Sequence, residues 1–140
     1  NVIPQSAKLR GTFRTLDPAV REEAEKRIRH VASNTAETFG AEAKVSVNRG
    51  YPVTMNHPDQ TDFAIEVASA VSGRGKVNPE VAPVMGGEDF SYMLEARPGA
   101  FIFMGNGDSA FLHHPEYDFN DDAIPHGVSY WVTLAERALA

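Results

Sequence analysis

The residues best suited to chemistry in this sequence lie in one short segment. Residues 112–122 have the sequence Leu-His-His-Pro-Glu-Tyr-Asp-Phe-Asn-Asp-Asp, with two imidazoles and four carboxylates in eleven positions. Imidazole nitrogens and carboxylate oxygens suit zinc and its first-row neighbours, and loops are where such ligands usually project. The segment therefore indicates a metal site, although a polar loop held by turn hydrogen bonds would have the same composition.

The two histidines of this segment are adjacent, which limits what they bind together. Neighbouring side chains on an extended loop point in opposite directions, so His113 and His114 are not expected to bind one ion. At most one of them is a first ligand. A carboxylate such as Asp118 or Asp121 would then orient its ring through the second nitrogen.

Two further candidate sites are less specific. Gly86-Gly87 allows a ligand to approach the backbone, and Glu88 and Asp89 follow at the start of an expected helix, where they would suit a positive partner or act as ordinary capping residues. Arg14 offers a planar fork for a carboxylate or a developing oxyanion, and Asn1 lies at the other end of the same strand region. A plain surface arginine is the alternative for Arg14.

Composition excludes several classes of protein. The chain has 140 residues, 42% hydrophobic and 23% charged, and no apolar run approaches the roughly 20 residues that cross a bilayer. A net charge of −6 disfavours a nucleic-acid partner, which would need clustered Lys and Arg. The absence of cysteine excludes disulfides, thiolate ligands and a cysteine nucleophile. The first residues also lack a signal-peptide pattern, so we expect a cytoplasmic protein without a membrane partner.

Hydrophobic spacing predicts a strand, a helix and a second strand in the first third of the chain. Residues 7–14 alternate apolar and polar positions, as do residues 43–49. Between them, Asp17-Pro18 begins a helix whose apolar residues recur every three or four positions as far as Gly40. Residues 1–52 are thus expected to form a small sheet with a helix on one face.

A second domain is expected over residues 53–140, after the break at Gly50-Tyr51-Pro52. Its expected elements are a helix of about fourteen residues ending near Gly73, a Pro- and Gly-rich loop, a short helix over 88–96, a strand over 100–104, the histidine loop and a final helix. This half is α/β in character, and the whole chain is predicted to be α/β (α+β).

Taken together, four strings of residues resemble one enzyme family. They are Asn1-Val2-Ile3-Pro4, Arg10-Gly11-Thr12-Phe13-Arg14-Thr15, Gly86-Gly87-Glu88-Asp89-Phe90, and Leu112-His113-His114-Pro115 running into Tyr117-Asp118-Phe119-Asn120-Asp121. In this order and spacing they resemble the metal-dependent amidohydrolases of the hippurate hydrolase and N-acyl-amino-acid deacylase type, relatives of aminoacylase and carboxypeptidase G. The resemblance covers nearly the whole chain.

The resemblance implies a catalytic α/β domain interrupted by a ferredoxin-like lid that often dimerises. Residues 1–52 would be half of that lid, and residues 53–140 the C-terminal part of the catalytic domain. It implies that His113 is a metal ligand, that Asn1 and Arg14 contact the substrate carboxylate or the oxyanion, and that Glu88 lines the site. The implied reaction is hydrolysis of the amide bond of an N-acyl amino acid or peptide by water activated by two divalent metals, with zinc as the first choice and manganese, cobalt or nickel as alternatives.

The sequence also departs from that family. Relatives supply most metal ligands and the general-base glutamate from an N-terminal half that has no counterpart here, whereas a catalytic zinc needs about three protein ligands. We therefore expect an incomplete, inactive fragment that lacks the N-terminal half of its catalytic domain. The resemblance also implies a homodimer through the lid. A non-catalytic dimerisation or binding module, or a dipeptidase or aminopeptidase of the same family, stays open as an alternative.

Overall fold

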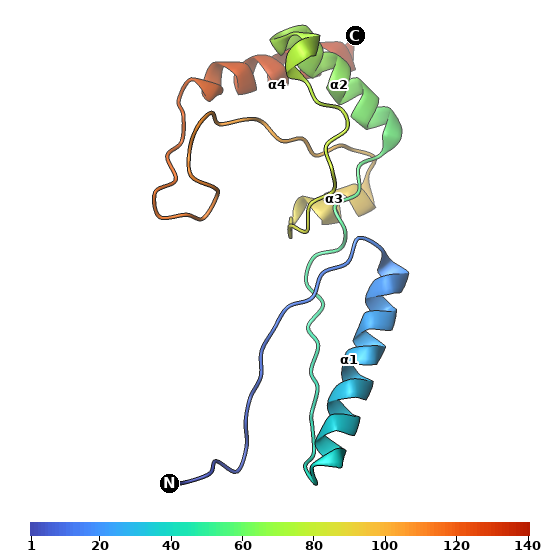
Figure 1. Cartoon of the computed structure of the whole chain (residues 1–140). Helices are drawn as coiled ribbons and strands as arrows, with labels where there is room; N and C mark the ends of the chain where they lie inside the picture. Colours follow the sequence, from blue (N-terminus) through green and yellow to red (C-terminus); the bar gives the residue numbers. More distant parts are fainter. The chain divides into compact units, whose positions relative to one another are not determined.

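The computed structural model describes residues 1–140, and its regular elements are all helices (Figure 1). They are α1 (Pro18–Thr38), α2 (Pro58–Ser72), the 3₁₀ helix η1 (Arg74–Lys76), α3 (Phe90–Ala96) and α4 (Ala123–Leu139). The chain divides into two compact units, one formed by Asn1–Val53 with Val84–Gly87 and the other by Thr54–Pro83 with Glu88–Ala140. None of the helices is long and apolar enough to pass through a membrane.

The predicted α/β architecture is wrong, because the structure contains no β-strand. Residues 7–14, 43–49 and 100–104, which we expected as strands, have no regular secondary structure, so neither half of a ferredoxin-like lid nor a catalytic sheet is present. A strand needs the backbone groups of a neighbouring strand as partners. Here side chains take some of those groups instead: the Arg29 guanidinium donates to the Val45 carbonyl, and the Asn56 amide pairs with Phe101.

The alternation that suggested a strand over residues 43–49 nevertheless has a physical counterpart. Ala43, Val45 and Val47 are half-buried, whereas Lys44 and Ser46 between them are exposed. The segment therefore keeps the two-residue period of a strand without a hydrogen-bonded neighbour.

Helix α1 begins and ends close to the predicted positions, for the predicted reasons. The Asp17 carboxylate accepts hydrogen bonds from the N–H groups of Ala19 (2.7 Å) and Val20 (3.0 Å), and Pro18 occupies the first helical position, where its missing N–H costs nothing. The chain leaves the helix through Gly40, whose φ of +69° suits glycine. These signals are local, so the sequence alone shows them.

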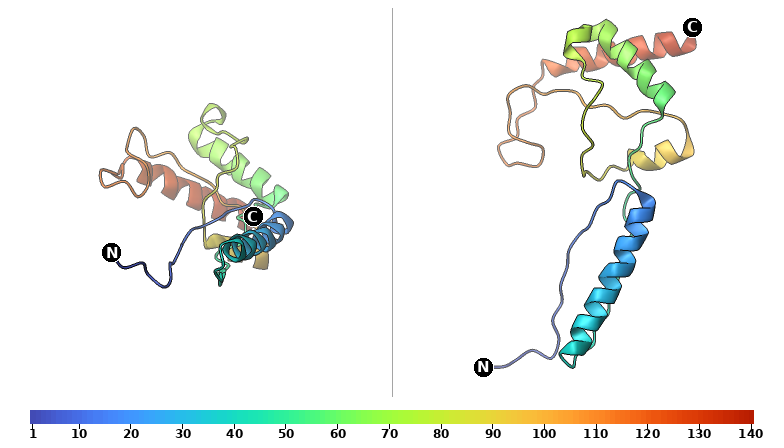
Figure 2. Two further views of the ribbon diagram at one scale, coloured as in Figure 1. Left: turned by 60° about the horizontal axis from the view of Figure 1, so that its bottom comes forward. Right: turned by 45° about the vertical axis from the view of Figure 1, so that its right-hand side comes forward.

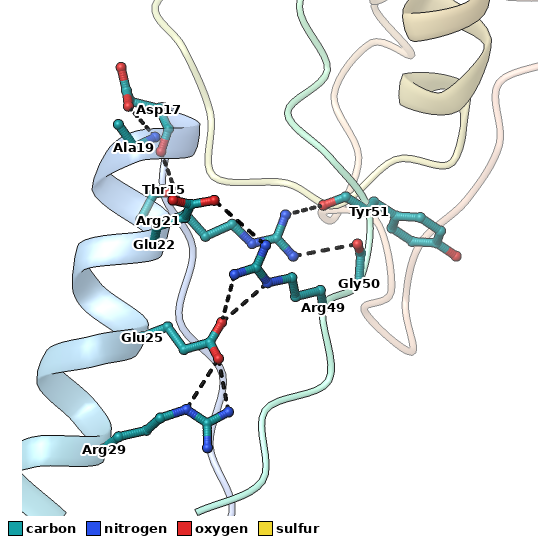
Figure 3. Close-up of polar contacts among 10 residues, drawn as sticks. All are labelled: Thr15, Asp17, Ala19, Arg21, Glu22, Glu25, Arg29, Arg49, Gly50 and Tyr51. Carbon is teal, nitrogen blue, oxygen red and sulfur yellow. Dashed lines mark hydrogen bonds and ion pairs between the residues drawn. The ribbon is translucent and has the colours of Figure 1, made fainter.

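Charged side chains attach α1 to the segment that follows it in the same unit (Figure 3). Glu25 lies between Arg29, one turn further along the helix at 2.8 Å, and Arg49 at 3.1 Å. Arg21 donates to the Gly50 and Tyr51 carbonyl oxygens. No residue of α1 is buried, so these polar contacts, rather than a hydrophobic core, link the helix to residues 45–51.

In the second unit, α2 packs against α4 (Figures 1 and 2). Ala64 and Val67 of α2 are buried, together with Ala123 and Tyr130 of α4. Gly73 ends α2 with a φ of +85° and donates its N–H to the Ser69 carbonyl. This packed pair fixes where the histidine loop rejoins regular structure, because α4 begins directly after that loop.

A second attachment joins the start of α2 to residues 99–101. Both polar groups of the Asn56 amide are used, since Nδ2 donates to the Phe101 carbonyl (2.9 Å) and Oδ1 accepts from its N–H (2.8 Å). The His57 N–H donates to the Gly99 carbonyl at 3.0 Å. The Phe101 ring lies 5.7 Å from that of Phe90, so this attachment also reaches the first residue of α3.

Candidate active-site segments

His113 lies at the tip of an exposed loop, in a backbone conformation that few residues adopt. Its φ is +69°, and it is the one non-glycine residue of the chain with a positive φ. Such a conformation costs roughly 1–2 kcal/mol, and residues held in it cluster at functional sites. No hydrogen bond or ion pair engages the His113 ring, so both of its nitrogens are available to a ligand.

His114 differs from His113 although the two are neighbours. Its Nδ1 accepts a hydrogen bond from the Glu116 N–H (3.1 Å), and its own N–H donates to the Phe111 carbonyl (3.0 Å). The His114 ring therefore stabilises a turn within the loop. This geometry favours His113 over His114 as the candidate ligand, as proposed from the sequence, while ligation itself stays a prediction.

The residues of this chain do not complete a metal centre. No group of three or more His, Asp or Glu side chains is arranged to hold an ion, whereas a catalytic zinc needs about three protein ligands. Asp118 and Asp121, which we considered as partners of an imidazole, instead line an open hollow of about 410 Å³ beside the base of the loop. The chain thus does not by itself provide the three ligands of such a site, and His113 stays the predicted ligand.

Glu88 has a local role in the structure. Its Oε1 accepts from the Phe90 N–H (3.2 Å), and its carbonyl oxygen accepts from the Ser91 hydroxyl (2.5 Å). Asp89 occupies the N-cap position of α3 but makes no side-chain capping bond, so Glu88 stabilises the first turn. The capping alternative considered from the sequence is therefore realised by Glu88. A place for its carboxylate in an active site stays a prediction.

Asn1 and Arg14 belong to the other unit, and both are exposed. No bond joins one to the other, and none joins Glu88 to His113 within the second unit. Within each unit, the two predicted site residues are therefore not joined by a hydrogen bond or ion pair. Their roles toward a substrate stay predictions.

Sequence reasoning overlooked the polar residues that shape the histidine loop. Asn106 and Ser109 bond to the backbone of Asp118 and Asn120 and so close the loop at its base. Asn106 stands between two glycines, Gly105 and Gly107, which is an ordinary turn signal. No local pattern shows that this amide bonds to a segment twelve or more residues away.

Comparison with known proteins identifies the class. The sequence profile of Peptidase family M20/M25/M40 matches residues 6–137, nearly the whole chain, and the chain belongs to this family. The family is metal-dependent, and its substrates are acyl amino acids and peptides. The resemblance inferred from the four sequence strings is thereby confirmed.

Three curated relatives illustrate the range within the family. The chain is 33% identical over 139 residues to a hippurate hydrolase of Campylobacter jejuni, covering 99% of this chain and 36% of the relative. It is 33% identical to an N-acetyldiaminopimelate deacetylase of Streptococcus sanguinis, covering 91% and 34%. It is 37% identical over 106 residues to thermostable carboxypeptidase 2 of Saccharolobus solfataricus, covering 75% and 26%.

The chain spans about a quarter to a third of the length of these relatives (26–36%). No solved structure matches it significantly. The family assignment therefore rests on sequence, and the activity of a whole enzyme is a matter for proposal.

Proposed function

We propose that this chain is the C-terminal part of a metal-dependent amidohydrolase that cleaves the amide bond of N-acyl amino acids of the hippurate type. The observation that carries the proposal is the presentation of His113 within the region matched to the family. This residue is exposed on a loop with its ring unbonded, while the adjacent imidazole is used in a turn. The remaining metal ligands and the general base would come from a segment outside these 140 residues.

Within this proposal each unit supplies different groups. His113 provides one imidazole ligand to a divalent metal site, for which zinc is the first candidate, and Glu88 lines the same site while its Oε1 caps α3. Arg14 and Asn1 contact the substrate carboxylate or the oxyanion, for which a guanidinium fork and an amide have suitable donors. In this proposal Arg14 and Asn1 act on a bound substrate, either in their own chain or from a partner copy of the first unit.

The test compares two adjacent histidines in the complete hydrolase that we propose contains this chain. His113→Ala should lower metal retention after dialysis and hydrolysis of hippurate by more than about 100-fold, because it removes a ligand. His114→Ala is the matched control and should retain both properties within roughly threefold, because it loses only a turn hydrogen bond. Equal losses in the two variants, or a larger loss in His114→Ala, would falsify the assignment.

A peptide substrate is the second candidate, because thermostable carboxypeptidase 2 is as similar to this chain as the acyl-amino-acid hydrolases are. The discriminating measurement is kcat/KM of the complete enzyme for benzoylglycine, a free dipeptide and an N-blocked dipeptide. A preference of about tenfold or more for benzoylglycine supports the first proposal, since that ratio equals about 1.4 kcal/mol of transition-state binding. A preference for either dipeptide supports the second.

A further inference from the structure

The loop that carries His113 is closed by a side-chain amide in place of a backbone ladder. Asn106 Nδ2 donates to the Asp118 carbonyl oxygen (2.7 Å), and Asn106 Oδ1 accepts from the Asn120 N–H (2.8 Å). These two backbone groups belong to residues two apart, as do the groups that a strand presents along one edge. The amide of Asn106 therefore substitutes for the peptide of a neighbouring strand.

Ser109 adds a second closure at the same place. Its hydroxyl oxygen lies 3.2 Å from the Asp118 nitrogen, whose N–H it accepts, and 3.0 Å from the Asp118 carbonyl, to which it donates. A hydroxyl has one donor and two acceptor positions, so it accepts from the Asp118 N–H while its one proton is shared between the Asp118 carbonyl and the Ala110 carbonyl, which lies 3.2 Å away. The result is a loop over residues 106–120 whose ends lie close together, as in an Ω-loop.

The large apolar side chains at the tip of this loop are mostly exposed. Phe111 and Leu112, the two large apolar residues before His113, are 92% and 67% exposed. His113 is seven positions from both Asn106 and Asn120, at the middle of the loop, and holds a positive φ. A strained residue keeps its conformation only where surrounding structure enforces it. The hydrogen bond from the His114 N–H to the Phe111 carbonyl acts directly at the tip, and the closure at the base restrains the two ends of the loop.

We propose that Asn106 and Ser109 are positioning residues, which fix the loop of residues 106–120 so that His113 is presented to a metal. The positioning role rests on the proposed function, because only that function assigns a metal to His113. The closure of the loop does not depend on it, because all the closing hydrogen bonds lie within this chain. Two experiments therefore address the two parts separately.

The first experiment measures loop order in the 140-residue chain by nitrogen-15 relaxation of the amides of residues 110–117, except Pro115, which has no N–H. Asn106→Ala and Ser109→Ala should lower their order parameters below about 0.6, the range of flexible backbone, while the amides of α4 stay unchanged. Ser109→Thr keeps the hydroxyl and should behave as the original chain does. Order parameters for residues 110–117 that are unaltered in both alanine variants overturn the inference, whatever the enzyme does.

The second experiment uses the complete hydrolase. Asn106→Asp and Ser109→Ala should each lower metal affinity and kcat by about 10- to 100-fold, the range found when groups that orient a ligand are removed. The KM should stay within about twofold, because substrate binding is not altered directly. Ser109→Thr should restore both properties.

Asn78→Asp is the matched control for the added charge. Asn78 Oδ1 accepts only from the Glu80 N–H within its own turn, so the same amide-to-carboxylate change there should leave metal affinity and kcat unchanged. Variants with a loosened loop but original metal affinity and kcat overturn the positioning role. If the complete hydrolase without substitutions neither binds metal nor hydrolyses the substrate, the proposed function is overturned. The relaxation experiment then still decides whether Asn106 and Ser109 close the loop.

Discussion

Glu25 shows how single residues stabilise a helix that has no buried face. The hydrogen bond from Arg29 is the main reason that the pKa of Glu25 lies below its ordinary value of 4.5, and Arg49 adds to the effect, while partial desolvation opposes it. The same carboxylate thus binds one arginine on α1 and one from the segment after it (Figure 3). At the residue scale, the environment of Glu25 therefore differs from what its residue type alone suggests.

The lowered pKa of Glu25 predicts how its contacts respond to acid. A carboxyl whose pKa is lower in the folded state stabilises that state above its unfolded pKa, and the contribution is lost as pH falls through the folded pKa. A carbon-13 titration of the Glu25 carboxyl should give a midpoint below 4.5, and Arg29→Gln should move it upward. A midpoint at or above 4.5 in the original chain would show that the Arg29 and Arg49 contacts do not form in solution.

At the scale of elements, the two apolar faces of α4 have different environments. Ala123 and Tyr130 are buried in the second unit, and burial raises the pKa of the Tyr130 hydroxyl. On another face of the same helix, Val128, Trp131 and Val132 are more than half exposed. Periodicity identifies such faces, but only packing shows which of them α2 covers.

A pair of valine substitutions tests this difference. Val67 of α2 is 0% exposed, and Val67→Ala should lower the free energy of unfolding by roughly 1.5–3 kcal/mol, from two lost methyl groups and a residual cavity. The same change at Val128, which is 56% exposed, should cost less than about 0.5 kcal/mol. Urea unfolding followed by circular dichroism measures both values, and equal losses would contradict the packing of α2 on α4.

At the scale of the whole molecule, few apolar side chains are enclosed. The buried apolar residues are Ala64, Val67, Leu94, Ala123 and Tyr130. Many larger side chains are exposed, including Phe39 at 83% and Trp131 at 66%. Val128, Trp131 and Val132 lie within one turn of α4, and this exposed apolar face fits the proposal that the chain functions together with a further segment.

The exposed apolar surface predicts that the 140-residue chain binds the dye anilinonaphthalenesulfonate. Val128→Lys with Val132→Lys should lower the dye fluorescence without loss of helical circular dichroism, because both residues are more than half exposed on α4. Lys44→Arg is the control and should change nothing, since residue 44 is polar and exposed. Absence of dye binding by the original chain would mean that these side chains are covered in solution.

The helices and the candidate ligand could both be predicted from the sequence, but for different reasons. Asp17-Pro18 at the start of α1 and Gly73 at the end of α2 act on their own helices, so their meaning is visible in a few residues. The preference for His113 over His114 came from a resemblance, and the structure adds a geometric reason in the Glu116 contact of His114. The presence of strands could not be predicted from such local signals. Alternation at residues 43–47 indicates which side chains are exposed, but it does not show that a neighbouring strand is there to form hydrogen bonds.

The sequence by itself determined the positions of the helices, the family and the short list of chemically active residues. These depend on hydrogen bonds between residues four apart, on capping groups beside each helix end and on motifs of a few residues. Only the tertiary structure decided that the extended segments lack partner strands, that α2 covers one face of α4, and that Asn106 and Ser109 close the histidine loop. Each of these outcomes depends on contacts between groups that are distant in the chain. No local sequence pattern predicts such contacts.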